Sequence, residues 1–131
     1  MKVVVTGSRH QHDMAFIWTE LDRIHAQTPI TRLAHGNCRG TDWICKNWAD
    51  NRGVLAVAYE AKWNQFGPAA GPIRNEEMLS LEQPTLVLAF DGGVGTKSCV
   101  KLARQRGLAV RHIPGGDISI RPPTNRPFLN R

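Results

Sequence analysis

The chain has 131 residues, of which 41% are hydrophobic, and it contains three cysteines. This length accommodates one domain rather than two, and the apolar content is too high for a disordered chain. No run of 18 apolar residues is present, and the first residues become polar too early for a secretory signal. The odd number of cysteines, without paired spacing, argues against a disulfide framework. We therefore expect a cytoplasmic protein with no membrane segment.

The net charge of +6 is concentrated toward the C-terminal end. Residues 1–96 carry nine Lys/Arg and ten Asp/Glu, whereas residues 97–131 carry eight Lys/Arg and one Asp. A basic field of this kind attracts phosphates, whether on nucleotides, nucleic acid or an anionic membrane. A solvated basic surface without any partner would give the same distribution, so charge alone does not choose among these functions.

Short apolar strands alternate with helices along the chain. The expected strands are 2–6, 32–35, 55–59, 85–90 and 109–113, and the expected helices are 14–26, 41–52, 71–81 and a last one that follows residues 91–96 and ends near 106. Asp13 is placed to cap the first helix, and Gly53 to end the second. Residues 1–113 should form the domain, and the proline-rich, basic residues 114–131 an extended or poorly ordered tail.

This alternation predicts an α/β fold with right-handed βαβ connections. We expect a Rossmann-like three-layer sandwich with a five-stranded parallel sheet in the order 3-2-1-4-5. Ligands of such sheets bind outside the carboxyl ends of the strands, at the switch point between the first and fourth strands. Each glycine-rich segment of this chain follows a strand at that edge.

Two candidate binding segments follow the first and second strands. After the first strand, Gly7 lets the backbone approach a ligand, Ser8 offers a hydroxyl, and Arg9 offers a guanidinium to phosphate. The second segment presents a helix N-terminus, which favours anions. Its candidate residues are Gly36, Arg39, Gly40, Thr41 and Asp42. Asp42 either caps the helix or accepts hydrogen bonds from a ribose.

The strongest single signal is the segment Asp-Gly-Gly-Val-Gly-Thr after the fourth strand. Gly92 and Gly93 are expected to adopt positive φ and expose backbone amides, and Gly95 and Thr96 open the next helix. Such a turn is typical of a phosphate cradle. The segment lacks the Gly-Lys-Ser/Thr ending of a P-loop, so it does not predict an ATPase.

Arg74 and Asn75, in the first turn of the third helix, can also reach a ligand at the strand ends. The alternative is that Glu76 and Glu77 merely complement the helix dipole while Arg74 is solvated. Elsewhere, the histidines have no metal-ligand spacing, so we expect neither a metal ion nor a cofactor. Cys99, one turn into the last helix, is expected to be a small buried hydrophobic residue rather than a nucleophile.

Taken in order, four motifs resemble one known family. They are residues 6–9 (TGSR), residues 39–42 (RGTD), Trp63 with Gly67 and residues 70–78 (AGPIRNEEM), and residues 90–96 (FDGGVGT). The set is similar to the YspA/YpsA-related branch of the SLOG superfamily, which also groups the Smf/DprA proteins and the LOG-type hydrolases. This resemblance spans about residues 2–113. It implies a protein that binds a nucleotide or a nucleotide-derived ligand in order to sense, sequester or process it.

One departure from the LOG-type enzymes bears on catalysis. Those nucleotide phosphoribohydrolases carry a catalytic glutamate in Pro-Gly-Gly-x-Gly-Thr-x-x-Glu, and Cys99 stands at the matching position. A thiol does not stabilise a cationic glycosidic transition state as a carboxylate does, so LOG-type hydrolysis is not expected. A nucleoside phosphate N-glycosidase that uses Asp42, Asp91 or Glu77 is one alternative. A DprA-like nucleic-acid-binding protein, suggested by the basic C-terminal segment, is another.

We also expect a homo-oligomer.

Overall fold

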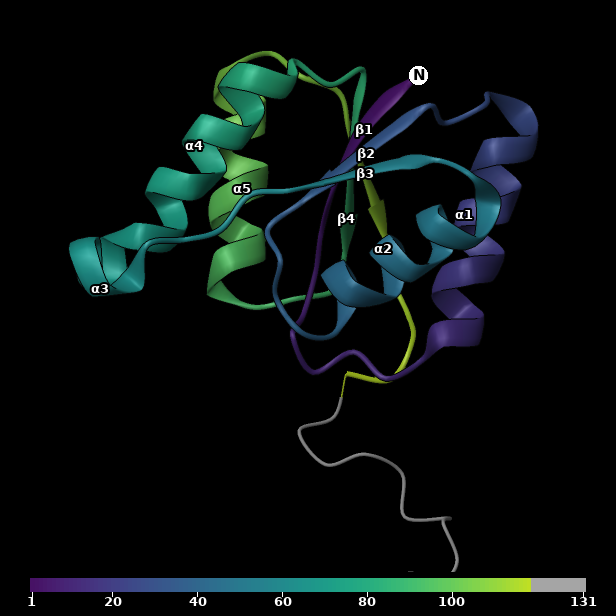
Figure 1. Ribbon diagram of the computed structural model, residues 1–131, viewed down its shortest axis with the longest axis horizontal. Coiled ribbons are helices and arrows are strands. Elements are labelled where there is room, and N and C mark those ends of the chain that lie inside the picture. The colour runs from purple at the N-terminus through teal and green to yellow at the C-terminus, as the bar shows by residue number, and fades with distance from the viewer. Residues whose placement is uncertain (119–131) are drawn as a thin grey trace, which may run out of the picture.

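The computed structural model describes residues 1–118, and the remainder of the expected tail lies outside the described residues. Strands and helices alternate as Figure 1 shows. The strands are β1 (Lys2–Thr6), β2 (Arg32–His35), β3 (Leu55–Ala58), β4 (Leu86–Phe90) and β5 (Val110–Ile113). The helices are α1 (Met14–Gln27), α2 (Thr41–Arg52), α3 (Trp63–Phe66), the 3-10 turn Gly67–Ala69, α4 (Ala70–Glu82) and α5 (Val94–Gln105).

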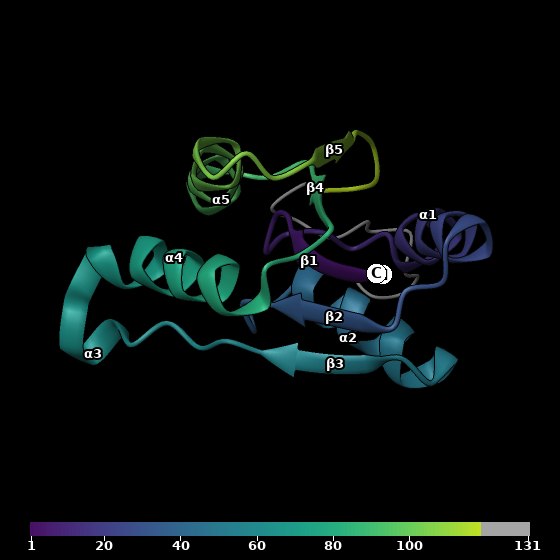
Figure 2. The same cartoon turned by 90° about the horizontal axis from the view of Figure 1, so that it is seen from above.

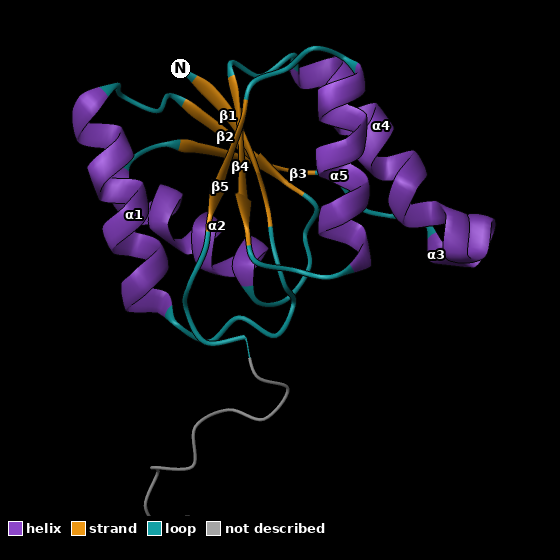
Figure 3. Ribbon diagram, turned by 180° about the vertical axis from the view of Figure 1, so that it is seen from behind, coloured by secondary structure: helices purple, strands orange, loops and turns teal. Residues whose placement is uncertain are grey.

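The five strands form one parallel sheet in the order β3-β2-β1-β4-β5, which confirms the predicted α/β architecture. Val4 at the centre of the sheet pairs with Ala34 of β2 on one side and with Val87 of β4 on the other. Helices α1 and α2 cover one face, and α4 and α5 cover the other (Figure 3). Both faces are covered, which explains why the central strands read as continuous apolar runs.

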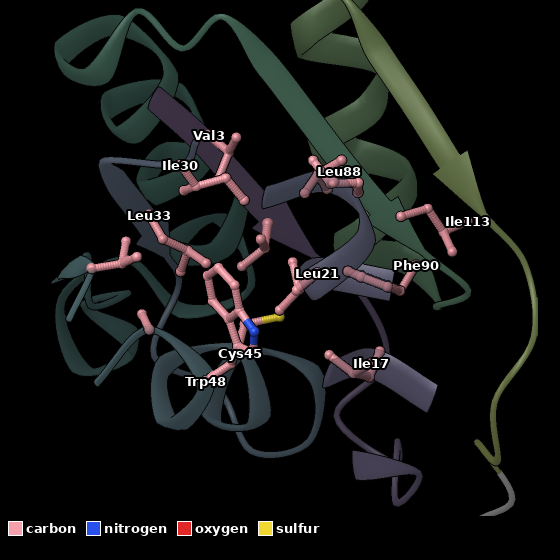
Figure 4. Packing of buried hydrophobic residues seen from close by; sticks show 14 of the residues in the cluster. Val3, Ile17, Leu21, Ile30, Leu33, Cys45, Trp48, Leu88, Phe90 and Ile113 are labelled. Atoms are coloured by element: carbon pink, nitrogen blue, oxygen red, sulfur yellow. The ribbon is translucent and has the colours of Figure 1, made fainter. Parts of the chain in front are cut away.

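Two hydrophobic clusters fix the helices to the sheet. Val3 and Val5 of β1 face α1 and α2, where they join a cluster that includes Leu21 and Trp48 (Figure 4). Val4 points the opposite way, because successive side chains of a strand alternate between the faces, and it packs in the cluster of α4 and α5. The carboxyl ends of β1, β2 and β4 are therefore held at one edge of the sheet, in fixed relation to the helices that follow.

The first helix begins as predicted, with the Oδ1 atom of Asp13 accepting a hydrogen bond from the backbone amide of Phe16 at 3.0 Å. The segment between β3 and α4, where neither a helix nor a strand was predicted, contains α3 and a 3-10 turn. This part extends away from the sheet (Figure 2), and α3 buries none of its residues. No helix among residues 1–118 is long and apolar enough to cross a membrane.

Candidate functional site

A cleft of about 510 Å³ opens at the carboxyl edge of the sheet. Its walls come from the segments after β1, β2 and β4 and from the region of α3 and α4, and its size is typical of a small-molecule site. The candidate residues that line it are Gly7, Ser8, Arg9, Gly36, Asp42, Arg74, Asn75, Gly93, Gly95 and Thr96. The fold thus brings together residues from all four of the segments singled out in the sequence.

The N-terminus of α5 forms one wall of the cleft. Gly93 is the N-cap residue, no side chain caps the helix, and the first turn carries no acidic residue. The amides of the first turn have no acceptor within the helix, so Val94, Gly95 and Thr96 present N–H groups and a partial positive charge. A Cβ atom built on Gly93 would meet no atom within 4 Å, so the space in front of this residue is open.

The expected positive φ at Gly92 and Gly93 is wrong: Gly93 has a φ of −101°, and Gly92 is not among the positive-φ residues. A different constraint requires glycine at position 92. A Cβ atom there would lie 2.2 Å from Oγ1 of Thr96 and 2.9 Å from the carbonyl carbon of Gly7. Gly92 therefore does not line the cleft; instead, it lets the turns after β1 and β4 pack directly against each other.

Three other candidates also lie outside the lining of the cleft. Thr41 is fully buried, and both its amide and its hydroxyl donate to the carbonyl oxygen of Ser8. Gly40 has a φ of +78°, and a Cβ atom there would lie 2.5 Å from the same oxygen. Both residues support the turn after β1, whose Ser8 amide also donates to the carbonyl oxygen of Asp91 at 2.9 Å. Arg39 is exposed to solvent.

Arg74 is buried rather than solvated. Its guanidinium links separate segments of the site. Its Nη1 atom donates to the carbonyl oxygen of Gly36 at 2.6 Å, and its Nε atom donates to Oδ1 of Asn75 at 2.8 Å. The Nδ2 atom of Asn75 donates in turn to the carbonyl oxygen of Gly95 at 3.3 Å. These bonds tie α4 to the loop after β2 and to the start of α5. The Nη2 atom of Arg74 has no hydrogen-bond acceptor among residues 1–118.

Asp42 does not cap α2, whose N-cap residue is Gly40, so the capping interpretation is wrong. Its Oδ2 atom accepts hydrogen bonds from the amides of Gly36 at 3.1 Å and Cys38 at 3.2 Å. Burial raises the pKa of the Asp42 carboxyl group to about 6, while the two amides and the nearby Arg74 guanidinium act in the opposite direction. The cleft therefore contains a carboxyl group that changes its charge close to neutral pH.

The other acidic and thiol groups considered for catalysis lie elsewhere. The carboxylate of Asp91 contacts Nε2 of His112 at 2.8 Å and accepts a hydrogen bond from the amide of Gly115 at 3.0 Å. Glu77 is exposed and borders a separate hollow along α4. Cys99 is fully buried, as predicted, and burial raises the pKa of its thiol to about 11. Of the three carboxylates considered, only Asp42 lines the cleft.

Several lining residues were not among the sequence candidates, and they are His10, Cys38, Trp63, Pro68, Gly71, Pro72, Met78, Val94 and Ser98, together with Val5 and Thr6 of β1. Six of them lie within the motifs of the family resemblance, namely Thr6, Trp63, Gly71, Pro72, Met78 and Val94, and the others are sequence neighbours of the glycine-rich segments. Trp63 is different, because it comes from α3 and its side chain is 55% exposed. Its place in the third motif of the family resemblance was the available signal.

A second hollow, of about 950 Å³, lies between α5 and β5. Lys97, Lys101 and Arg104 line it, and their spacing of four and three residues places them on one face of α5. They belong to the basic C-terminal segment that prompted the nucleic-acid hypothesis, whose other described arginines, Arg106 and Arg111, do not line this hollow. This hollow is distinct from the cleft, because Thr96 is the one described lining residue that the two share.

Comparison with known proteins agrees with this architecture. The model of the YspA, cpYpsA-related SLOG family matches residues 1–66. The chain belongs to this SLOG family. It is also 33% identical over 117 residues to the Gene 61 protein of Mycobacterium phage D29, an alignment that covers 83% of this chain and 93% of that protein. The SLOG match includes the turns after β1 and β2, whereas Arg74 and the α5 N-terminus lie beyond it.

Proposed function

We propose that this SLOG-family protein binds a nucleotide or a nucleotide-derived small molecule in the cleft at the carboxyl edge of the sheet. The observation that carries the proposal is the uncapped N-terminus of α5, which faces open space in the cleft. The phosphate of the ligand lies against the amides of residues 93–96, those of the predicted cradle that line the cleft. Helix N-termini of this kind bind anions because the amides donate hydrogen bonds and the helix dipole favours negative charge.

Two arginines supply positive charge to the phosphate end of the cleft. Arg9 lines the cleft from the turn after β1, and its exposed guanidinium is free to approach an anion. Arg74 contributes through its Nη2 atom, the part of its guanidinium that has no acceptor among the described residues. Guanidinium groups bind phosphate oxygens through charge-assisted hydrogen bonds, which are stronger than neutral ones.

Polar groups deeper in the cleft suit the sugar of a nucleotide. The Oδ1 atom of Asp42 has no donor among residues 1–118, so it is available to accept a hydrogen bond from a ribose hydroxyl. Ser8 accepts the amide of His10 through its Oγ atom at 2.9 Å, which leaves its hydroxyl proton for the ligand. These groups would orient the ligand, and the proposed function is binding, with no hydrolytic step assigned.

Substitution of Gly93 by valine tests the proposal. Residue 93 has room for a side chain within the protein and no positive φ, so Gly93→Val should fold normally while its side chain fills the phosphate position. Ligands released from the purified protein would first be identified by mass spectrometry, and their affinities measured by calorimetry. We expect Gly93→Val to lose binding, whereas Ala26→Val, which adds the same side chain at an exposed site on α1, keeps it. Unchanged affinity in Gly93→Val, with an unchanged melting temperature, would overturn the proposal.

A further inference from the structure

Trp63 has an environment that differs from those of the other tryptophans. Trp48 is fully buried, and Trp18 is covered by the guanidinium of Arg52, which lies 5.1 Å from the ring centroid. Trp43 is 46% exposed but does not line the cleft, and its Nε1 atom donates to Oδ1 of Asn37 at 3.3 Å. Trp63 is 55% exposed and lines the cleft, so its indole is open to a ligand there.

The position of the Trp63 indole is set by Gly71 in the first turn of α4. A Cβ atom on Gly71 would lie 3.2 Å from Cη2 of Trp63 and 4.0 Å from Cζ2 and Cζ3. The outer edge of the ring therefore rests against the helix backbone, while most of the ring remains uncovered. Helix α3 buries no residue and adds nothing to the core, so its contribution to the molecule is the placement of the side chains that it carries.

Helix α4 contacts both Trp63 and the first turn of α5. Gly71 contacts the indole, and Asn75 donates a hydrogen bond to the carbonyl oxygen of Gly95 in the first turn of α5. Residues 71 and 75 are four apart, which corresponds to about 6 Å along a helix. The contacts to the indole and to the first turn of α5 thus lie about one helical turn apart along α4, and Trp63 and residues 93–96 line the same cleft.

We infer that Trp63 is the base-recognition residue of the cleft, on whose indole the base of the bound nucleotide stacks. This inference rests on the proposed nucleotide function and adds to it the part of the ligand that α3 recognises. The phosphate lies at residues 93–96, the ribose lies beside Asp42 and Asn75, and the base extends to the arm formed by α3. Every nucleobase offers a π face, so stacking selects a nucleotide over a sugar phosphate without requiring one particular base.

The test compares ligands that share a phosphate and differ in the base. Binding of ribose 5-phosphate and of adenosine, guanosine, cytidine and uridine 5′-monophosphates would be measured by calorimetry. The proteins are the wild type, Trp63→Ala, Trp63→Phe and Trp43→Ala, the last of which removes another exposed indole, one outside the cleft. We expect Trp63→Ala to raise the Kd of the best nucleotide by about tenfold and to leave that of ribose 5-phosphate unchanged. Trp63→Phe should retain part of the preference for the nucleotide over ribose 5-phosphate, and Trp43→Ala should retain all of it.

Tryptophan fluorescence gives a second readout of the same contact. Nucleotides should quench the emission of the wild type and of Trp43→Ala, and should quench Trp63→Phe much less, because the remaining indoles lie outside the cleft. Equal affinity of the wild type for ribose 5-phosphate and every nucleotide would overturn the role of Trp63 while leaving the phosphate site intact. Unchanged nucleotide affinity in Trp63→Ala would do the same. If none of the five ligands bound and the purified protein released no nucleotide-derived molecule, the proposed function itself would fail, and this inference with it.

Discussion

Thr41 donates two hydrogen bonds to the carbonyl oxygen of Ser8, one from its amide at 3.0 Å and one from its hydroxyl at 2.9 Å. The two residues are far apart in the sequence, and the contact joins the first turn of α2 to the turn after β1. Thr41 itself is fully buried and does not line the cleft. Its effect on a ligand is therefore indirect, through the position of Ser8 and Arg9.

Replacement of Thr41 by valine should weaken binding without removing any group that touches the ligand. The variant keeps the amide bond to Ser8 and loses the hydroxyl bond, which should lower the free energy of unfolding by about 1 kcal/mol. Denaturant titration and calorimetry measure the two effects. Thr31→Val is a matched control, because the Thr31 hydroxyl donates to the carbonyl oxygen of Met1 at the opposite edge of the sheet. If Thr41→Val bound the ligand as tightly as the wild type does, the Thr41 hydroxyl would have no part in positioning Ser8 and Arg9.

The charge of Asp42 should make anion binding depend on pH. Burial raises the pKa of Asp42 to about 6, so the carboxyl group is mostly neutral at pH 5 and ionised at pH 7. A negative charge in the cleft repels an anion, and affinity for sulfate should therefore fall as the pH rises through about 6. Sulfate is the suitable probe because its own charge is constant in this range, whereas a phosphate monoester titrates near pH 6.

The control for this prediction is Asp42→Asn, which keeps an oxygen for the amides of Gly36 and Cys38 but cannot ionise. Any other group that titrates in the cleft contributes equally to both proteins. The amide resonances of residues 94–96 would report sulfate binding in an NMR titration at several pH values. The same pH dependence in Asp42→Asn as in the wild type would rule out Asp42 as its source.

The contact between Asp22 and Arg52 should stabilise the fold down to low pH. Two hydrogen bonds from the Arg52 guanidinium and one from Nε1 of Trp48 lower the pKa of Asp22 from 3.8 to about 2. A carboxyl group with a lowered pKa in the folded state stabilises that state above its unfolded pKa, and this contribution is lost as the pH falls toward the folded value. The window is therefore about pH 4 to pH 2.

Melting temperatures between pH 6 and pH 2 would test this expectation. Asp22→Asn should be less stable than the wild type above pH 4, and the difference should shrink as the pH falls toward 2. Asp50→Asn is the control, because Asp50 forms an exposed pair with Lys46 on α2, and exposed pairs of this kind contribute little. If the difference in melting temperature between Asp22→Asn and the wild type stayed constant from pH 6 to pH 2, the contribution assigned to the lowered pKa of Asp22 would be contradicted.

Release of free base from nucleoside monophosphates should be negligible in the wild type. Cys99 supplies no carboxylate at the position of the LOG-type glutamate, and loss of one electrostatic stabiliser of a transition state typically lowers the rate by about 10² to 10³. Chromatography of incubated nucleotides would detect turnover. Robust base release by the wild type that disappears in Asp42→Asn would contradict the expectation and make Asp42 the catalytic acid.

Introducing a glutamate at position 99 is expected to damage the fold rather than create an enzyme. Cys99 is fully buried in the cluster between α4, α5 and the sheet, so a glutamate there would lose the hydration of its carboxylate and force a larger side chain into a filled core. Cys99→Glu should melt well below Cys99→Ala in a thermal scan. A stable Cys99→Glu protein would mean that the α5 packing has more freedom than its complete burial indicates.

Much of the fold could be predicted from the sequence because the strands are short apolar runs with clear stops. The strand 2–6 and the helix that begins after Asp13 both fall within one residue of their expected bounds. Helix α3 was missed for a physical reason. It has four residues and buries none of them, so no apolar periodicity marks it, and the proline and glycine residues around it suggest a loop.

The cleft was predictable to the extent that it lies at the ends of the strands. Of the six candidate glycines, Gly7, Gly36, Gly93 and Gly95 line it, whereas the positive φ expected at Gly92 and Gly93 was wrong. Gly92 is required by close packing against Gly7 and Thr96 rather than by positive φ. The hydrogen bonds of Asp42 to Gly36 and Cys38 depend on how the loop folds back, which residue spacing along one chain does not determine.

The walls of the cleft come from four segments that are separated by whole strands and helices. Such a site does not exist in the unfolded chain, so a ligand that enters it binds only the native state and raises the melting temperature. At a free concentration one hundred times its Kd, a ligand adds about 2.7 kcal/mol to the free energy of unfolding. For a domain of this size that amounts to several degrees, so a thermal-shift screen of metabolites can identify the ligand without any assay of activity.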